Sequence, residues 1–287
     1  MPQLVQVADT ALLTLGTATL LAVVVAALRR GTWRDPLAGV PVPIGGPPFL
    51  GVVAVMVAFI AVQYLAVSLL AGDLTTDDPA PGSDAWHWRH LAGNAAAVVM
   101  VGLMAAALAA ARTPSDGPSA GLGAGLLAVV AGWLIVLPVS TVQAEMGRIV
   151  WDWLHPQQAP PVHVVLQALS RSDWGRWGTA QLVLGAVLVA PLTEELFFRG
   201  VLLGAVCHHF GRAWPAIVAT AVAFGLAHAQ PQDILPLISL GLVLGYLRLR
   251  CRALWPCILL HVLFNARTMA FVLLAPELLE PAANGGS

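Results

Sequence analysis

The sequence is poor in charge, since only 10% of its 287 residues are acidic or basic, against about 25% in an ordinary soluble domain. Lysine is absent, so all 14 basic residues are arginines, and the 15 acidic residues bring the formal net charge to −1. The chain is 58% hydrophobic, which excludes a soluble enzyme and a disordered chain. It also lacks the basic face of a nucleic-acid-binding protein, so we expect no nucleic-acid partner.

Cysteine is also scarce, with three residues and no CxxC spacing. This excludes a disulfide scaffold and a cysteine zinc knuckle, and Cys207, Cys251 and Cys257 are interpreted as small apolar side chains. What the chain has in abundance is long apolar runs without charge. These runs predict a polytopic protein embedded in the lipid bilayer.

Eight apolar segments are expected to cross the membrane, which predicts an all-α bundle of about eight transmembrane helices. Their predicted bounds are 10–28, 49–70, 91–111, 120–142, 178–210, 213–230, 234–249 and 254–274. As a straight helix, the fifth segment would be about 50 Å long, which exceeds the thickness of the bilayer. We therefore interpret it as one long or broken membrane element, with Pro191 as the obvious break point.

The segments divide the chain into four parts. The expected parts are N-terminal transmembrane helices over 1–142, a connecting segment over 143–177, a core over 178–274 and a tail over 275–287. The connecting segment mixes charge with four tryptophans, which is typical of a segment that lies at the membrane interface. A plain connecting loop is an equally good interpretation.

The arginines favour one side of the membrane. With eight alternating spans, eight of the 12 arginines in the connections fall on one side, and the acidic stretch around Asp77 falls on the other. The positive-inside rule then places both termini outside the cytoplasm. Because the composition is rich in alanine and uses only arginine, we expect the inner membrane of a bacterial cell.

Ionisable residues gather in the last four segments, although charge inside lipid is costly and marks a functional site by default. Two of the five glutamates of the chain, Glu194 and Glu195, lie side by side within an apolar run. The other polar residues of these segments that we single out are Arg199, His228, His261, Asn265 and Arg267. Counted from the arginine-rich side at about 1.5 Å per residue, the candidate groups fall within the bilayer, mostly in its far half.

Spacing gives this cluster a shape. Glu195 and Arg199 are four residues apart, so they share a helical face and can form an ion pair, while Glu194 is turned about 100° away from them. Phe224 with His228, and His261 with Asn265, are also four residues apart. Each residue alone also has a structural interpretation, as an ion-pair clamp or an interhelical hydrogen bond, and Arg267 is interpreted as structural.

The chemistry of the set is hydrolytic. A glutamate beside two histidines can activate water as a general base, and a histidine with an asparagine can donate hydrogen bonds to an oxyanion. One glutamate and two histidines also match a catalytic zinc site, so Glu194, His228 and His261 are the expected ligands if a metal is bound. The chain contains neither HExxH nor GxSxG.

The three motifs resemble those of the CPBP family of intramembrane proteases, which includes the type II CAAX prenyl endopeptidase (CAAX prenyl protease 2) and bacteriocin-processing proteases. The family pattern is EExxxR, then FxxxH, then HxxxN or HxxxD, on separate membrane helices. Here residues 194–199, 224–228 and 261–265 match it in order. The resemblance covers about residues 178–274.

The resemblance implies a CAAX-protease-like intramembrane (metallo)endopeptidase that acts on a membrane-associated peptide or protein. The implied catalytic residues are Glu194 and His228, which activate water, and His261 and Asn265, which form an oxyanion hole, with Glu195 and Arg199 orienting the site. The family has been described both as zinc metalloproteases and as metal-free glutamate proteases, so the expected cofactor is none or a single zinc ion. Two alternatives are a proton-coupled transporter and a non-catalytic membrane scaffold or immunity protein of the same fold.

Overall fold

The computed structural model describes residues 2–31, 37, 49–71, 83–110, 119–161, 165, 169, 175–228 and 230–275, and within them every regular element is helical. The predicted all-α class is thus confirmed. Seven of the described stretches are long and apolar enough to cross a bilayer, so the chain is a multi-pass membrane protein. The main helices are α1 (Pro2–Arg30), α2 (Phe49–Ala71), α3 (Asp84–Ala110), α4 (Leu122–Leu154), α9 (Ala213–Leu226), α10 (Ile234–Cys251) and α11 (Trp255–Leu274).

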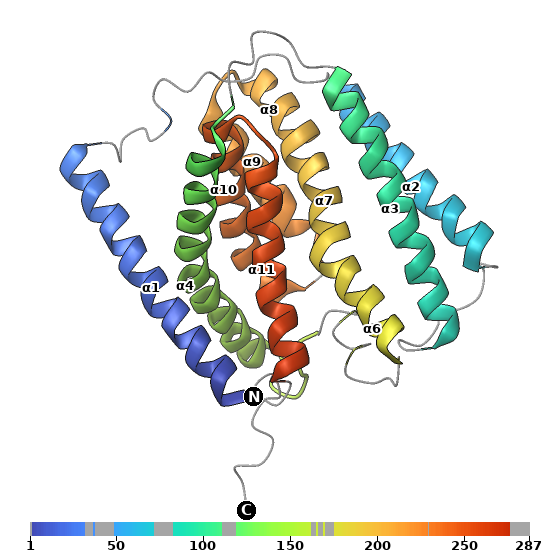
Figure 1. The fold of residues 1–287 in the computed structure, drawn as a ribbon, viewed down its shortest axis with the longest axis horizontal. Coiled ribbons are helices and arrows are strands. Elements are labelled where there is room, and N and C mark those ends of the chain that lie inside the picture. Colours follow the sequence, from blue (N-terminus) through green and yellow to red (C-terminus); the bar gives the residue numbers. More distant parts are fainter. Residues whose placement is uncertain are drawn as a thin grey trace, which may run out of the picture.

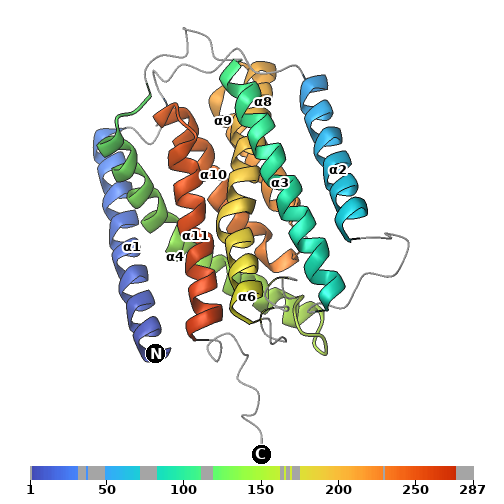
Figure 2. The ribbon, with the colours of Figure 1, turned by 45° about the vertical axis from the view of Figure 1, so that its right-hand side comes forward.

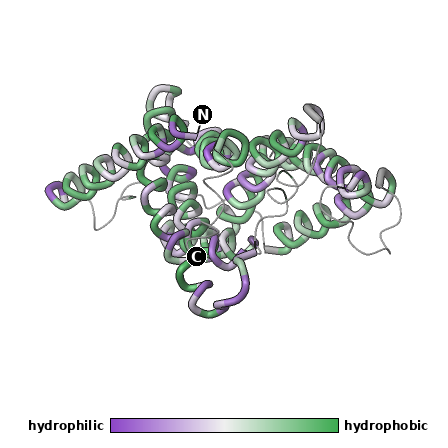
Figure 3. Tube along the Cα trace, turned by 90° about the horizontal axis from the view of Figure 1, so that it is seen from below, coloured by the Kyte–Doolittle hydropathy of each residue, from purple (hydrophilic) through white to green (hydrophobic). Residues whose placement is uncertain are grey.

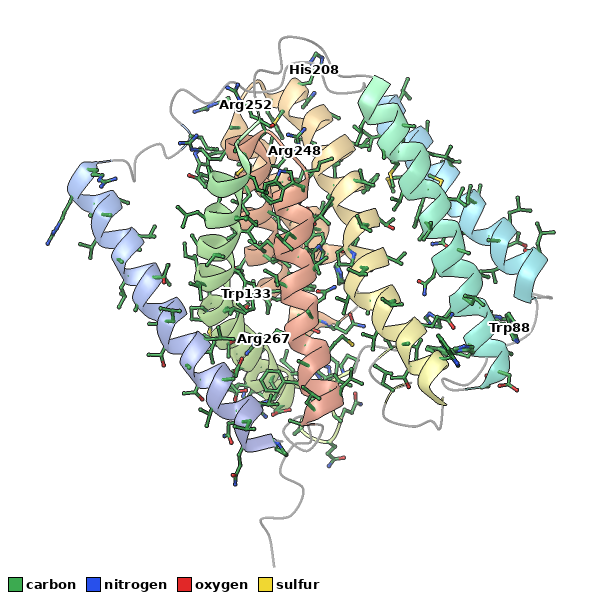
Figure 4. All side chains as sticks on the ribbon, viewed as in Figure 1. Trp88, Trp133, His208, Arg248, Arg252 and Arg267 are labelled. Carbon is green, nitrogen blue, oxygen red and sulfur yellow. The ribbon has the colours of Figure 1, made fainter. Side chains whose placement is uncertain are left out.

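The helices form one bundle with two outlying edges. Figure 1 shows α1 along one edge, the pair α2 and α3 along the other, and the remaining helices between them. The N-terminal end of α1 and the C-terminal end of α11 lie at the same end of the bundle. In Figure 4, His208, Arg248 and Arg252 all lie at the opposite end, in agreement with the predicted gathering of arginine on one side.

The predicted count of eight spans includes one element that is shorter than expected. The predicted segment 213–230 forms only the 14-residue helix α9 (Ala213–Leu226), which is too short to be counted among the seven long spans. The helix ends at Leu226, and Pro231 begins the short 3-10 turn η5 (Pro231–Asp233) that follows. Figure 3 shows that hydrophobic residues, in green, predominate along the helices.

Helix α4 continues past residue 142, where the predicted span ends, to Leu154. Its last turns carry Arg148 between Glu145, at 2.6 Å, and Asp152, at 2.8 Å. Pairs with these spacings support a helix. Figure 2 shows that the end of α4 turns away from the direction of its first turns, and Pro138 inside the helix accounts for the bend.

Of the two interpretations of the fifth segment, the structure shows the long element, and the chain does not break at Pro191. The span Trp177–Phe210 is one continuous helix, drawn in gold in Figure 1. Its consecutive parts are α6 (Gly175–Leu184), the π-helical η3 (Gly185–Val189), α7 (Ala190–Glu195), the π-helical η4 (Leu196–Leu202) and α8 (Leu203–Phe210). Pro191 has no N–H and therefore cannot donate a backbone hydrogen bond within the helix. The wider π turn before it leaves room for the proline ring, so the helix continues without a break.

Helices α9 and α10 approach each other closely near the site. A Cβ atom added at Gly241 would lie 2.9 Å from both Cα and Cβ of Ala221, and a backbone atom cannot give way. We expect Gly241→Ala to lower the free energy of unfolding by about 1–3 kcal/mol, as overpacking does. Thermal unfolding in detergent measures this effect.

Gly102→Ala is the matched control for that prediction, because nothing lies within 4 Å of a Cβ at Gly102 in α3. The control should stabilise the protein by about 0.5–1 kcal/mol through helix propensity. Equal unfolding temperatures for the two variants would contradict the close contact of α9 with α10.

Candidate active site

Helices α7 and α11 meet through a buried chain of three charged or polar side chains. Glu195 Oε1 accepts a hydrogen bond from Arg199 Nη1 at 2.7 Å and lies 2.9 Å from His261 Nδ1. The side chains of Glu195, Arg199 and His261 are all at most 2% exposed. The predicted ion pair between Glu195 of α7 and Arg199 of η4 is therefore present. Glu195 also contacts His261, so the pair is connected to α11.

Glu194 lies on the other side of His261. Its Oε2 is 3.8 Å from His261 Nε2, and its side chain is 28% exposed, whereas that of Glu195 is completely buried. The two adjacent glutamates thus differ as their spacing predicted: one is enclosed in an ion pair, and the other is accessible. His261 lies between the two carboxylates, with one ring nitrogen toward each.

The environment of Arg199 explains how a guanidinium is kept inside a membrane helix. Its Cζ lies 4.5 Å from the centre of the Phe224 ring, and its Nη2 donates to the carbonyl of Gly241 at 3.4 Å. An aromatic face, a carbonyl and a carboxylate together replace the water that the charge has lost. Gly241 belongs to α10, so the arginine connects η4, α9 and α10.

His228 follows the end of α9 and is held by its own helix. Its Nδ1 lies 2.9 Å from the carbonyl oxygen of Phe224, which can only accept, so Nδ1 carries the proton of this bond and Nε2 is left for other partners. The ring of Phe224 lies 5.0 Å from that of His228 and 5.6 Å from that of His261. The Phe224 ring therefore brings the two imidazoles together beside Glu194, whose Oε2 lies 3.8 Å from His261 Nε2.

Asn265 is anchored by the π-helical turn. Its Nδ2 donates to the carbonyl of Ala186 at 2.9 Å. In the π register, the amide of Ala190 bonds to the carbonyl of Gly185, and the next residue, Pro191, has no N–H for the carbonyl of Ala186. The proline and the π turn therefore leave one backbone acceptor free, and Asn265 occupies it from α11.

The structure brings Glu194, Glu195, Arg199, His228 and His261 into one group, with Asn265 one turn from His261. Arg267, in contrast, pairs with Asp9 of α1, which sequence reasoning did not single out. Asp233, in the 3-10 turn η5 (Pro231–Asp233) five residues after His228, was also not singled out. Both Asp9 and Asp233 are acidic residues at the edge of an apolar run, and this position could have identified them from the sequence.

The predicted zinc ligand set does not fit this geometry. Among the described residues, no three His, Cys, Asp or Glu side chains are arranged to hold a metal ion. The metalloprotease alternative is thus unsupported, and no chemical step is derived through a metal.

The fold and the site together define a polytopic membrane protein with a carboxylate and two imidazoles inside the bundle. Residues 176–267 match the family described as Type II CAAX prenyl endopeptidase Rce1-like, which confirms the resemblance noted from the three motifs. The matched stretch begins in α6 and ends in α11, so it contains every residue of the group.

Two bacterial proteins are similar to parts of this chain. One is the "Putative membrane peptidase YdiL" of Bacillus subtilis (strain 168), 25% identical over 103 residues, which are 36% of this chain and 39% of that protein. The other is an "Uncharacterized 24.3 kDa protein" of Escherichia coli, 33% identical over 84 residues, which are 28% of this chain and 39% of that protein. The chain therefore spans about two fifths of the length of these relatives. No solved structure matches it significantly.

Proposed function

We propose that this protein is an intramembrane endopeptidase, in which a water molecule activated by Glu194 and a histidine attacks a peptide bond of a membrane-associated peptide or protein. The observation that carries the proposal is the pairing of an accessible Glu194 with His261, whose other nitrogen is held by the buried Glu195–Arg199 ion pair. The match to a family described as endopeptidases supports the same reaction class.

Glu194 has the position of a general base. Its side chain is 28% exposed, and its Oε2 lies 3.8 Å from His261 Nε2. We assign it the removal of a proton from the attacking water, and His228 the sharing of that proton through its free Nε2 before it passes to the leaving amine. Holding the water and the scissile carbonyl together removes much of the entropy cost of the attack.

His261 and Asn265 are assigned to the oxyanion that forms on the scissile carbonyl. For His261 to donate from Nε2, both ring nitrogens must carry a proton, and the carboxylates of Glu194 and Glu195 supply the compensating negative charge. Asn265 uses one N–H for the carbonyl of Ala186, which leaves its second N–H as a donor. Arg199 and Glu195 orient the imidazole, as the third member of a catalytic triad does.

The proposal is tested with purified protein in proteoliposomes. The probe is a set of fluorophore- and quencher-labelled peptides, each with one apolar segment, incubated in water enriched in ¹⁸O. Cleavage that places ¹⁸O in the new carboxyl terminus is expected. A protein that cleaves no probe but carries a solute along a pH gradient would be a transporter instead.

Asn265→Ala tests the oxyanion assignment. Because the loss of one oxyanion donor typically costs about 10²–10³ in kcat, a decrease of that order is expected, with KM changed far less. Gln157→Ala is the control, since that side-chain amide lies in the exposed turn after α4 and has no assigned role in the reaction. A kcat for Asn265→Ala equal to that of the control would contradict the assignment.

A further inference from the structure

An ion pair joins two membrane helices from opposite ends of the chain. Arg267 Nε donates to Asp9 Oδ1 at 2.6 Å, and Arg267 Nη2 donates to Asp9 Oδ2 at 2.9 Å. Their side chains are only 21% and 16% exposed. The guanidinium also lies 5.2 Å from the centre of the Phe271 ring. A bidentate pair of this kind fixes orientation as well as distance.

Helix α11 therefore has two polar faces. Arg267 follows Asn265 by two residues, so on a helix it points about 200° away from it. His261 and Asn265 face the long central helix, and Arg267 lies on the side of α11 toward α1 (Figure 4). The rotation of α11 about its axis is thus set by polar contacts on both sides.

The other contact of α1 is a close approach to α4. A Cβ at Gly16 would lie 2.4 Å from the carbonyl oxygen of Leu134, and Gly16 is the one fully buried residue among those described in α1. Most of the remaining α1 surface is exposed. Asp9 is therefore the polar residue by which α1 is attached to the helix that carries His261 and Asn265.

We propose that Asp9 and Arg267 are positioning residues of the active site, and that α1 is a working part of it although it lies outside the matched stretch 176–267. The ion pair holds α11 at the rotation that directs His261 toward the two glutamates and Asn265 toward the π turn. Neither Asp9 nor Arg267 touches the reacting atoms, and both act through α11. This inference rests on the proposed peptidase function.

The first arm of the test measures cleavage of the labelled peptides. Asp9→Asn and Arg267→Gln should each lower kcat about tenfold to a hundredfold, the cost of a small misplacement of catalytic groups, with KM within about threefold. Arg267→Lys keeps the charge but loses the bidentate geometry, so its kcat should fall between those of wild type and Arg267→Gln. The charge-reversed double variant Asp9→Arg/Arg267→Asp should recover most of the lost kcat.

The second arm measures the position of α11 without any need for activity. In a protein whose three native cysteines are replaced by alanine, Ala186→Cys and Asn265→Cys are cross-linked in membranes with a short bismaleimide. Adding Asp9→Asn should slow the cross-linking several-fold. The control is Arg148→Gln, which removes an exposed arginine from an ion-paired cluster on α4 and should leave both kcat and cross-linking unchanged.

The outcomes separate the two proposals. Wild-type protein that cleaves none of the peptides would overturn the peptidase function, and the cross-linking arm would then still decide the role of the ion pair. Unchanged cross-linking in Asp9→Asn overturns the positioning role. So does a wild-type kcat in both single variants of an otherwise active protein. A fall in unfolding temperature with unchanged kcat marks Asp9 and Arg267 as structural only, which also overturns the inference.

Discussion

Replacing Glu194 with glutamine is expected to lower the rate of peptide cleavage by about 10³–10⁴-fold, the upper part of the range for loss of a general base. Glutamine preserves the size of the side chain and its hydrogen bonds but cannot accept a proton from water. The protein should still fold, because Glu194 is the more exposed of the two adjacent glutamates and takes no part in the buried ion pair of Glu195 with Arg199. The measurement is kcat on the labelled peptides, with unfolding temperature as the check on folding.

Glu145→Gln is the matched control for the loss of a glutamate. Glu145 lies on the exposed last turns of α4, paired with Arg148. Its substitution should leave kcat unchanged. If Glu194→Gln and Glu145→Gln turned over peptides at equal rates, another group would have to activate the water, and the proposed mechanism would fail.

Replacing Glu195 with leucine should cause the largest loss of stability of any single change near the site. It leaves the guanidinium of Arg199, which is 2% exposed, without its carboxylate partner. Removing one partner of a buried ion pair costs about 3–5 kcal/mol, because the remaining charge is buried and uncompensated. The same change frees His261 Nδ1, so whatever protein remains folded should also lose cleavage.

The double variant Glu195→Leu/Arg199→Leu separates these two effects. With both charges gone, stability should recover much of the loss, since a buried pair replaced by apolar residues is often close to neutral. Cleavage should not recover, because the imidazole has no orienting partner. A double variant that is no more stable than Glu195→Leu would show that Arg199 is not held mainly by this carboxylate.

The different environments of the two adjacent glutamates followed from spacing alone. A difference of one position turns a helical side chain by about 100°, so Glu194 and Glu195 could not share one environment. Arg199, four residues on, identified which of them would be paired. The structure agrees, with 28% exposure for one glutamate and none for the other.

The behaviour of Pro191 did not follow from the sequence. A proline inside a 33-residue run favours a break by local rules. The structure instead contains a π turn before it, and the spare carbonyl of Ala186 is bonded to Asn265 from a helix some 80 positions away. Asn265 is far from Pro191 in the sequence, so the residues near the proline could not indicate that the helix continues.

The role of Arg267 was hidden for the same reason. Its partner Asp9 lies 258 positions away, at the start of a helix without any recognised motif. From the sequence of α11 alone, Arg267 lies on the face opposite Asn265 and is interpreted only as a structural residue. The ion pair becomes visible once α1 and α11 are placed together.

The sequence by itself determined the membrane class, the all-helical fold and the three motifs, because apolar runs and intervals of four residues are local properties that act through the bilayer and the helical repeat. The tertiary structure alone decided how those motifs meet: which nitrogen of His261 faces which glutamate, what holds Asn265, and that α1 is tied to α11. Such contacts depend on how separate helices pack, and contacts between residues 66 to 258 positions apart produce no periodic pattern in one sequence.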